Sequence, residues 1–230
     1  VLMVIPVKWH DDALQLRGGW IVKFKAADNG RIYTVRPVLL PNESRDEASV
    51  SEVALLRDLE EARRQYVGRK YWALIGKLPR VGTNVTGGEY VHYRRTSIVT
   101  ISDVLAGEDS SRPVRLVVTN DTGEEGYMDI AGSPTNMSSS LYATMKEHLV
   151  DRELSNVDPH LLHKWPARIW KAIEAGSVLT GMTSKQAEMS WDQPSTTSRT
   201  IQNGHLHEQW VYDEDSYLYF DDGILTAIQN

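Results

Sequence analysis

The chain has 230 residues, 41% of them hydrophobic and 24% charged, a globular composition that excludes disorder over most of the length. It contains no cysteine, which excludes disulfides, thiol catalysis and cysteine-based zinc or iron–sulfur sites. The formal net charge of -6 argues against a nucleic-acid-binding protein, because such proteins displace counterions with clustered Lys and Arg.

A β-hairpin is the first predicted element. Two runs of β-branched and aromatic residues, 20–24 and 31–35, lie on either side of Asp28-Asn29-Gly30. This sequence is typical of a tight turn between paired strands, so the two runs are predicted to pair.

A helix is predicted next, over about residues 50–66. Ser49 and Glu52 have the spacing of a capping box at its beginning, and apolar residues then recur at helical intervals. Gly68 is placed to end it.

Short strand-like runs then continue to about residue 132. They lie at residues 71–75, 90–93, 97–101, 114–118 and 127–130. Strands of this length and spacing predict a small barrel or a curled antiparallel sheet, so residues 1–132 are expected to form a β-rich N-terminal region.

A serine-rich stretch over residues 132–140 marks a boundary. Ser140 is placed to cap a short helix that carries Leu141, Met145 and Leu149. Residues 133–164 are therefore interpreted as a linker with a short helix.

The remaining segment, 165–230, begins with two predicted helices. The first has an apolar stripe and a stop signal at Gly176. Thr183 and Gln186 have the spacing of a capping box for the second, and Pro194 prevents its continuation.

Four strands are predicted after the helices. Asn203-Gly204 and Asp222-Gly223 are two-residue turn sequences, and the acidic stretch 213–215 joins the middle strands. The order α-α-β-β-β-β predicts an α+β module whose antiparallel sheet is covered by helices on one face.

Four motifs follow one another in this segment. They are Gly181-Met-Thr183 followed by Gln186, Trp191-Asp-Gln-Pro194, Glu208-Gln-Trp-Val-Tyr212 and Tyr217-Leu-Tyr-Phe-Asp-Asp-Gly223. Over about residues 168–229 they resemble the SmpA/OmlA-like superfamily of small envelope lipoproteins, which includes an accessory subunit of the outer-membrane β-barrel assembly machine. Asp192 stands where the family pattern has glycine, and Asp tolerates a left-handed backbone better than most residues.

The resemblance implies a bacterial protein of the cell envelope or periplasm, but fold does not carry over an activity. The sequence has no nucleophile-elbow, phosphate-loop or dinucleotide-binding motif. We therefore expect a protein without enzymatic activity, cofactor or metal, which recognises or scaffolds an unidentified envelope protein.

No apolar run reaches the roughly 18–20 residues of a spanning helix. The chain, which begins at Val1, is interpreted as a processed form that was lipid-anchored before processing.

Four aromatic residues are the candidate binding site. Trp210 and Tyr212 share one face of a strand, and Tyr217 and Tyr219 share one face of the next. If such a set faces outward, it forms an aromatic patch of the kind enriched at protein interfaces. Alternation does not decide which face is inward, so a role in the core stays open.

Charged and ionisable clusters have simpler interpretations. His205 and His207 share a strand face but lack a third ligand, so they are interpreted as solvated hairpin histidines rather than a metal site. His160 and His163 would join them only if the fold brought them near. The acidic residues of the sheet turns are attributed to turn chemistry and solubility, and the pairs Arg63-Arg64 and Arg94-Arg95 to solvated faces.

The alternative function is binding of a small ligand or carbohydrate by the N-terminal β region. Trp20, Trp72 and Tyr90 would then serve as stacking platforms. An exposed aromatic groove in the first 130 residues would favour this alternative.

Overall fold

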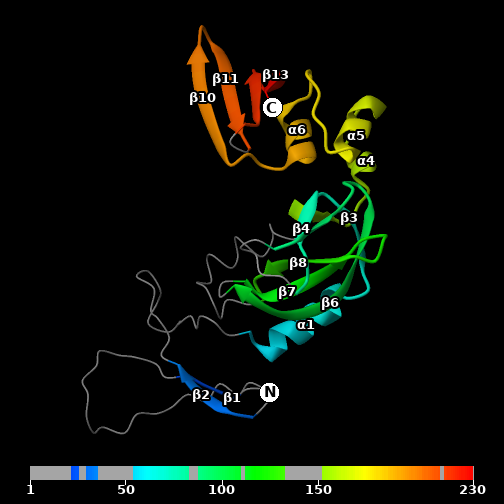
Figure 1. Cartoon of the computed structure of the whole chain (residues 1–230), viewed down its shortest axis with the longest axis vertical. Coiled ribbons are helices and arrows are strands. Elements are labelled where there is room, and N and C mark those ends of the chain that lie inside the picture. The colour runs from blue at the N-terminus through cyan, green and yellow to red at the C-terminus, as the bar shows by residue number, and fades with distance from the viewer. Residues whose placement is uncertain are drawn as a thin grey trace, which may run out of the picture. The chain divides into compact units, whose positions relative to one another are not determined.

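A computed structural model describes residues 22–25, 30–35, 54–82, 88–109, 112–132, 152–212 and 215–229 (Figure 1). Contacts divide the chain into two compact units. The first comprises Val1–Arg69, Thr100–Thr119 and Glu125–Asp151, and the second Lys70–Val99, Asn120–Glu124 and Arg152–Asn230. The division predicted at residues 133–164 stays a prediction, because residues 133–151 lie outside the described part.

The first unit contains the predicted hairpin. Strands β1 (Val22–Lys25) and β2 (Ile32–Val35) pair antiparallel, which confirms the prediction. Gly30 precedes β2 with a φ of 69°, a conformation that glycine adopts without steric cost.

Three longer strands follow: β6 (Ile98–Asp109), which lies in this unit from Thr100 onward, β7 (Arg112–Thr119) and β8 (Glu125–Ile130). They pair antiparallel with β7 in the centre, and the six middle residues of β7 are buried. Arg115 of β7 makes hydrogen bonds of 2.8 and 3.0 Å to Asp129 of β8, and its guanidinium lies over the Tyr127 ring. These contacts satisfy a charge that would otherwise be costly to bury.

Helix α1 (Leu56–Tyr66) contacts β7 and buries Asp58 and Ala62. The predicted beginning at residue 50 is wrong, because residues 54 and 55 precede the helix without helical structure. Leu55 is the N-cap and makes no side-chain capping bond, so the proposed capping box, which falls outside the described residues, does not cap α1. The predicted end is confirmed: Gly68 follows with a φ of 80°.

The second unit contains two short strand pairs. Strand β3 (Lys70–Ala73) pairs with β9 (Leu154–Ser155), and β4 (Lys77–Pro79) pairs with β5 (Tyr90–His92). The sequence did not predict β4 or β9. The described strands form open antiparallel sheets, so the small barrel expected for the N-terminal region is not seen among them.

The rest of the second unit has the predicted order of two helices and four strands, preceded by a short helix, α4 (Pro159–Leu162). The helices are α5 (Ala167–Glu174) and α6 (Ser184–Trp191), and the strands are β10 (Thr196–Gln202), β11 (His205–Val211), β12 (Tyr217–Asp221) and β13 (Ile224–Gln229). The strands form an antiparallel sheet in sequence order, coloured orange to red in Figure 1. We refer to residues 165–229 as the C-terminal module.

Local signals set the limits of these elements. The Thr183–Gln186 capping box at the start of α6 is present with both of its hydrogen bonds. The two turns predicted from Asn203-Gly204 and Asp222-Gly223 have positive φ at both central residues, as type I′ hairpin turns require.

The core of the C-terminal module lies between its helices and one face of the sheet. Ile173 and Met182 contribute from the helical side, and Leu218, Phe220 and Leu225 from the strands, each with at most 1% exposure. Burial of these apolar side chains supplies the main driving force for folding of the module. Among the described helices, none is long and apolar enough to cross a membrane.

Candidate functional site

The four aromatic residues predicted as a binding patch lie on two different faces of the sheet. Trp210 is only 7% exposed and contacts Phe220 in the core, with ring centroids 4.5 Å apart. Tyr212 is half-buried and packs against the same core. Tyr217 and Tyr219 lie on the opposite face, so the four residues do not form one patch.

The strand register explains this division. Trp210 pairs with Leu218, whereas Gln209 pairs with Tyr219. Paired residues share a face, so Tyr219 lies on the outer face, away from the helices. Its hydroxyl hydrogen-bonds to Gln229 and to Gln209 there, and its ring is half-buried.

Strand β10 is the most exposed element of the C-terminal module. All seven of its residues are exposed, and Ile201 reaches 75%. Among the described strands it pairs only with β11, and Figure 1 shows it as the strand farthest from α6. A cross-strand ion pair joins β10 to β11: Arg199 Nε donates a hydrogen bond to the buried Glu208 carboxylate at 2.6 Å.

Along β10, the backbone N–H and C=O groups of successive residues point alternately toward β11 and toward the open edge of the sheet. In β11, Leu206 bonds to Asp222 on the β12 side, so even-numbered residues of β11 point their backbone groups toward β12. Odd-numbered residues of β11 therefore bond to β10, where their partners are even-numbered. The N–H and C=O groups of Thr197, Arg199 and Ile201 consequently point to the open edge.

The histidines of the sheet pair with carboxylates. His205 Nδ1 lies 2.7 Å from Asp222, and His207 Nδ1 lies 2.5 Å from Asp221. The bond to Asp222 raises the pKa of His205 and lowers that of Asp222. Asp213 and Glu214, which completed the predicted acidic end of the sheet, lie outside the described residues.

The other two histidines have separate surroundings. His160 lies between Asp158, at 2.8 Å, and Glu174, at 3.2 Å, while His163 stacks on Trp165. Burial lowers the pKa of His163. In the described part of the chain, no three His, Asp or Glu side chains are placed to hold a metal ion.

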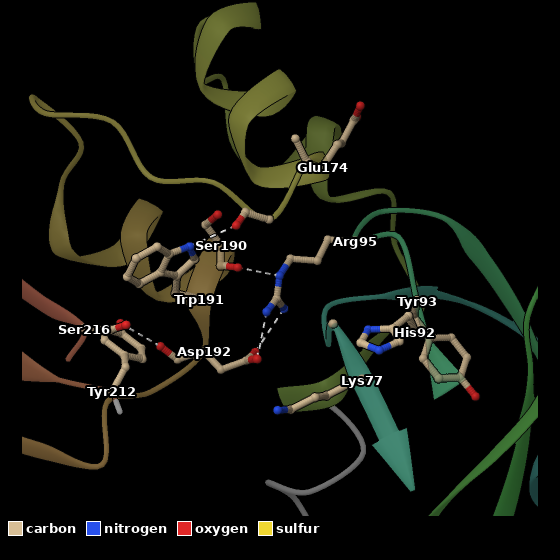
Figure 2. Close-up of a pocket in the computed structure, with 13 residues that line it drawn as sticks. Lys77, His92, Tyr93, Arg95, Glu174, Ser190, Trp191, Asp192, Tyr212 and Ser216 are labelled. Carbon is tan, nitrogen blue, oxygen red and sulfur yellow. Dashed lines mark hydrogen bonds and ion pairs between the residues drawn. The ribbon is translucent and has the colours of Figure 1, made fainter. Parts of the chain in front are cut away.

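A second feature of the unit, missed by the sequence analysis, is a pocket of about 430 Å³ (Figure 2). Its walls come from the β4–β5 hairpin, the ends of α5 and α6, and the segment that links β11 to β12. Six side chains give it its chemical character: Lys77, His92, Arg95, Glu174, Trp191 and Tyr212.

Arg95 lies at the centre of this pocket. Its side chain is only 6% exposed and makes two hydrogen bonds to the Asp192 carboxylate, of 2.9 and 2.7 Å. It also donates to the carbonyl oxygens of Ser190 and Leu74. The interpretation of Arg94-Arg95 as a solvated face is therefore wrong for Arg95, because a buried guanidinium needs the partners that it has here.

The backbone of Asp192 is unusual. Its φ of 65° and ψ of -171° fall in a region that is essentially restricted to glycine. Such a conformation costs roughly 1–3 kcal/mol and persists only where neighbouring contacts enforce it. Here the carboxylate bound to Arg95 and the Asp192 carbonyl, which accepts from the Tyr212 hydroxyl at 3.0 Å, supply those contacts.

Trp191 and Tyr212 form the aromatic wall of the pocket. Their rings meet edge to face with centroids 5.3 Å apart, and Trp191 Nε1 donates to the Gly176 carbonyl at 2.9 Å. Burial, with the nearby carboxylates of Glu188 and Asp192, raises the pKa of Tyr212 far above its ordinary value. Its hydroxyl therefore remains a hydrogen-bond donor throughout the physiological pH range.

One sequence signal pointed toward this pocket. The backbone at Asp192 strongly favours glycine, and the SmpA/OmlA-like pattern that the sequence resembles has glycine at this position. The sequence alone does not identify Arg95 as the partner of this carboxylate. Comparisons of the chain with protein families, with curated proteins and with solved structures gave no match.

Proposed function

We propose that this chain is a non-catalytic recognition protein, which binds an extended segment of a partner protein along the edge of strand β10. The observation that carries the proposal is the seven-residue exposure of β10 at the edge of the C-terminal sheet. Addition of a strand to an open edge is a recurring mode of peptide recognition, in which main-chain hydrogen bonds supply affinity.

Edge strands of soluble proteins are usually protected by charge, proline, bulges or a covering element. Strand β10 has one charged residue, Arg199, and that charge is engaged by Glu208. Its other residues include Thr197 and the highly exposed Ile201, a composition that favours strand pairing. Ile201 pairs with the half-buried Leu206, so the bound segment is expected to place an apolar side chain over these two.

The cellular setting of this proposal rests on the resemblance to the SmpA/OmlA-like superfamily. The helix–helix–four-strand order of the C-terminal module supports it, as does the positive φ at Asp192, where the family pattern has glycine. We therefore place the protein in the bacterial cell envelope or periplasm, with an envelope protein as its partner.

Capture from cell-envelope extracts by crosslinking tests this function. Thr197→Pro removes one N–H that faces the open edge without removing a hydrogen bond to β11, and proline is tolerated on such edges. Thr197→Val is the matched control, because it alters the same side chain and keeps the N–H. The proposal predicts a partner that crosslinks to β10 and is lost with Thr197→Pro but kept with Thr197→Val.

Folding of both variants is checked by circular dichroism, so that loss of binding is read only from a folded protein. Equal capture by the two variants, or crosslinks that map away from β10, would exclude edge recognition. A second copy of this chain on β10 would instead show a homodimer, which also contradicts a heterologous partner.

The carbohydrate alternative has less structural support. Trp20 lies outside the described residues, and Trp72 is half-buried in a strand. Tyr90 is 43% exposed, with Lys77 Nζ 5.2 Å from its ring centroid. The described residues of the N-terminal region therefore do not bring the three stacking platforms together as one exposed aromatic groove.

A further inference from the structure

Two cations, Arg95 and Lys77, and two carboxylates, Asp192 and Glu174, line the pocket around Arg95, but they are not evenly distributed in it. Arg95 and Asp192 neutralise each other, and Glu174 accepts hydrogen bonds from Thr96 and His160. Figure 2 shows the Glu174 carboxylate turned away from Arg95. No carboxylate among the described residues lies within ion-pair distance of Lys77, whose ammonium nitrogen lies 5.2 Å from the centroid of the Tyr90 ring.

The position of Lys77 directs this charge toward the pocket. Lys77 and His92 are paired residues on β4 and β5, so their side chains lie on the same face of the hairpin. Both line the pocket, and both are exposed. An anion bound there would meet an ammonium group and an imidazole, and both can donate hydrogen bonds to a carboxylate.

The opposite wall is suited to a planar group. The paired rings of Trp191 and Tyr212 are held rigidly by the bonds from Trp191 to Gly176 and from Tyr212 to Asp192. Rigid aromatic walls with a few polar groups are typical of small-molecule sites, and about 430 Å³ is within the usual range of their volumes.

We propose that this pocket binds an aromatic carboxylate, with the carboxylate at Lys77 and His92 and the ring against Trp191 and Tyr212. This inference is independent of edge recognition, because no residue of β10 lines the pocket. The same chemistry occurs in a free aromatic acid and at a protein C-terminus that ends in an aromatic residue, and the test distinguishes them.

Binding is measured by NMR on the full chain with N-acetylphenylalanine as the probe. Its neutral amide and the cation phenethylamine are matched compounds with the same ring. The proposal predicts that the acid shifts the Trp191 indole signal, assigned with Trp191→Phe, together with the Lys77 and His92 amide signals. The amide and the amine are expected to bind at least about tenfold more weakly, since each lacks the charge-assisted bond.

Lys77→Gln is expected to weaken binding of the acid by about tenfold, since it removes the ammonium group that pairs with the carboxylate. Lys171→Gln, an exposed lysine of α5 outside the pocket, is the matched control and should leave the affinity unchanged. A tetraglycyl-phenylalanine peptide with a free carboxylate distinguishes the sources. Binding as tight as that of the acid assigns a protein C-terminus, and weaker binding assigns a free acid.

Three results would overturn the proposal. They are the absence of any shift at millimolar acid, equal binding of the acid and the amine, and an affinity that Lys77→Gln does not change. Because the Lys77 side chain is exposed, its replacement is not expected to unfold the protein, and the spectrum itself verifies the fold.

Discussion

Arg95 and Asp192 are joined by two hydrogen bonds of 2.9 and 2.7 Å, although 97 residues separate them in the sequence. The bond lies within one structural unit and connects the segment after β5 to the end of α6. Arg95 also bonds to the Ser190 carbonyl, so a single side chain fixes both the backbone and the side chain of this helix end.

Arg95→Ala is expected to destabilise the protein by roughly 2–4 kcal/mol. The reason is that the carbonyl oxygens of Ser190 and Leu74 lose their donor in a buried environment, and Asp192 loses its partner. Arg94→Ala is the control, because Arg94 is exposed and should change stability by less than about 0.5 kcal/mol. Urea unfolding measures both, and equal effects would contradict the structural role of Arg95.

Asp192→Ala is expected to be less stable than Asp192→Gly by about 1 kcal/mol. Both variants lose the carboxylate, but only alanine keeps the cost of a side chain at a φ of 65°. The difference between them therefore isolates the backbone strain from the ion pair. If alanine were as stable as glycine in a denaturant titration, Asp192 would not have this backbone conformation.

The stability that the ion pair of His205 with Asp222 contributes should fall at both low and high pH. The pKa of His205 is raised, so its contribution to stability is complete below the ordinary value of 6.5 and disappears as pH rises through the raised value. The pKa of Asp222 is lowered, so its contribution is complete above the ordinary value of 3.8 and disappears as pH falls through the lowered value. The pair is therefore strongest between these two ordinary values.

An NMR titration of the His205 ring tests this dependence. Asp222→Asn should bring its pKa back toward the ordinary value, because the bond to Asp222 is the largest cause of the shift. Asp221→Asn is the matched control and should have a smaller effect, since Asp221 is the weakest contributor. Equal effects of the two variants would mean that Asp222 is not the bonded partner.

The two faces of β12 should respond differently to truncation. Leu218→Ala is expected to cost roughly 2–5 kcal/mol, since Leu218 is fully buried in the core of the C-terminal module. Tyr219→Ala removes a half-buried ring on the outer face and should cost no more than about 1 kcal/mol. A larger loss for Tyr219 in thermal unfolding would show that the faces are assigned in reverse.

Local signals in the sequence predicted much of the C-terminal module. The capping box of Thr183 with Gln186 and the turns at Asn203-Gly204 and Asp222-Gly223 act through neighbouring backbone groups, so their geometry can be read from adjacent residues. The capping box predicted from Ser49 failed because a matching spacing alone does not show where a helix begins, and α1 begins at Leu56.

Nonlocal features were beyond the same reasoning. Alternation along a strand shows which residues of that strand share a face, but it does not show which face is inward. The burial of Trp210 against the helices and the strand register were needed to place Trp210 inward and Tyr219 outward. The pocket depends on the contact between Arg95 and Asp192, which lie 97 positions apart in the sequence. At this separation, the spacing of two residues in the sequence does not predict that they are in contact. The sequence shows that Asp192 departs from the glycine of the pattern it resembles, but it does not show that Arg95 is the partner of Asp192.

Amide hydrogen exchange of β10 tests the proposed recognition most directly. In the free chain, Thr197, Arg199 and Ile201 should exchange fast, because their N–H groups face the open edge, while Ser198 and Thr200 are protected by β11. With the partner bound, the three fast amides should become protected. Unchanged exchange at these three positions, with new protection elsewhere in the chain, would contradict recognition through the β10 edge.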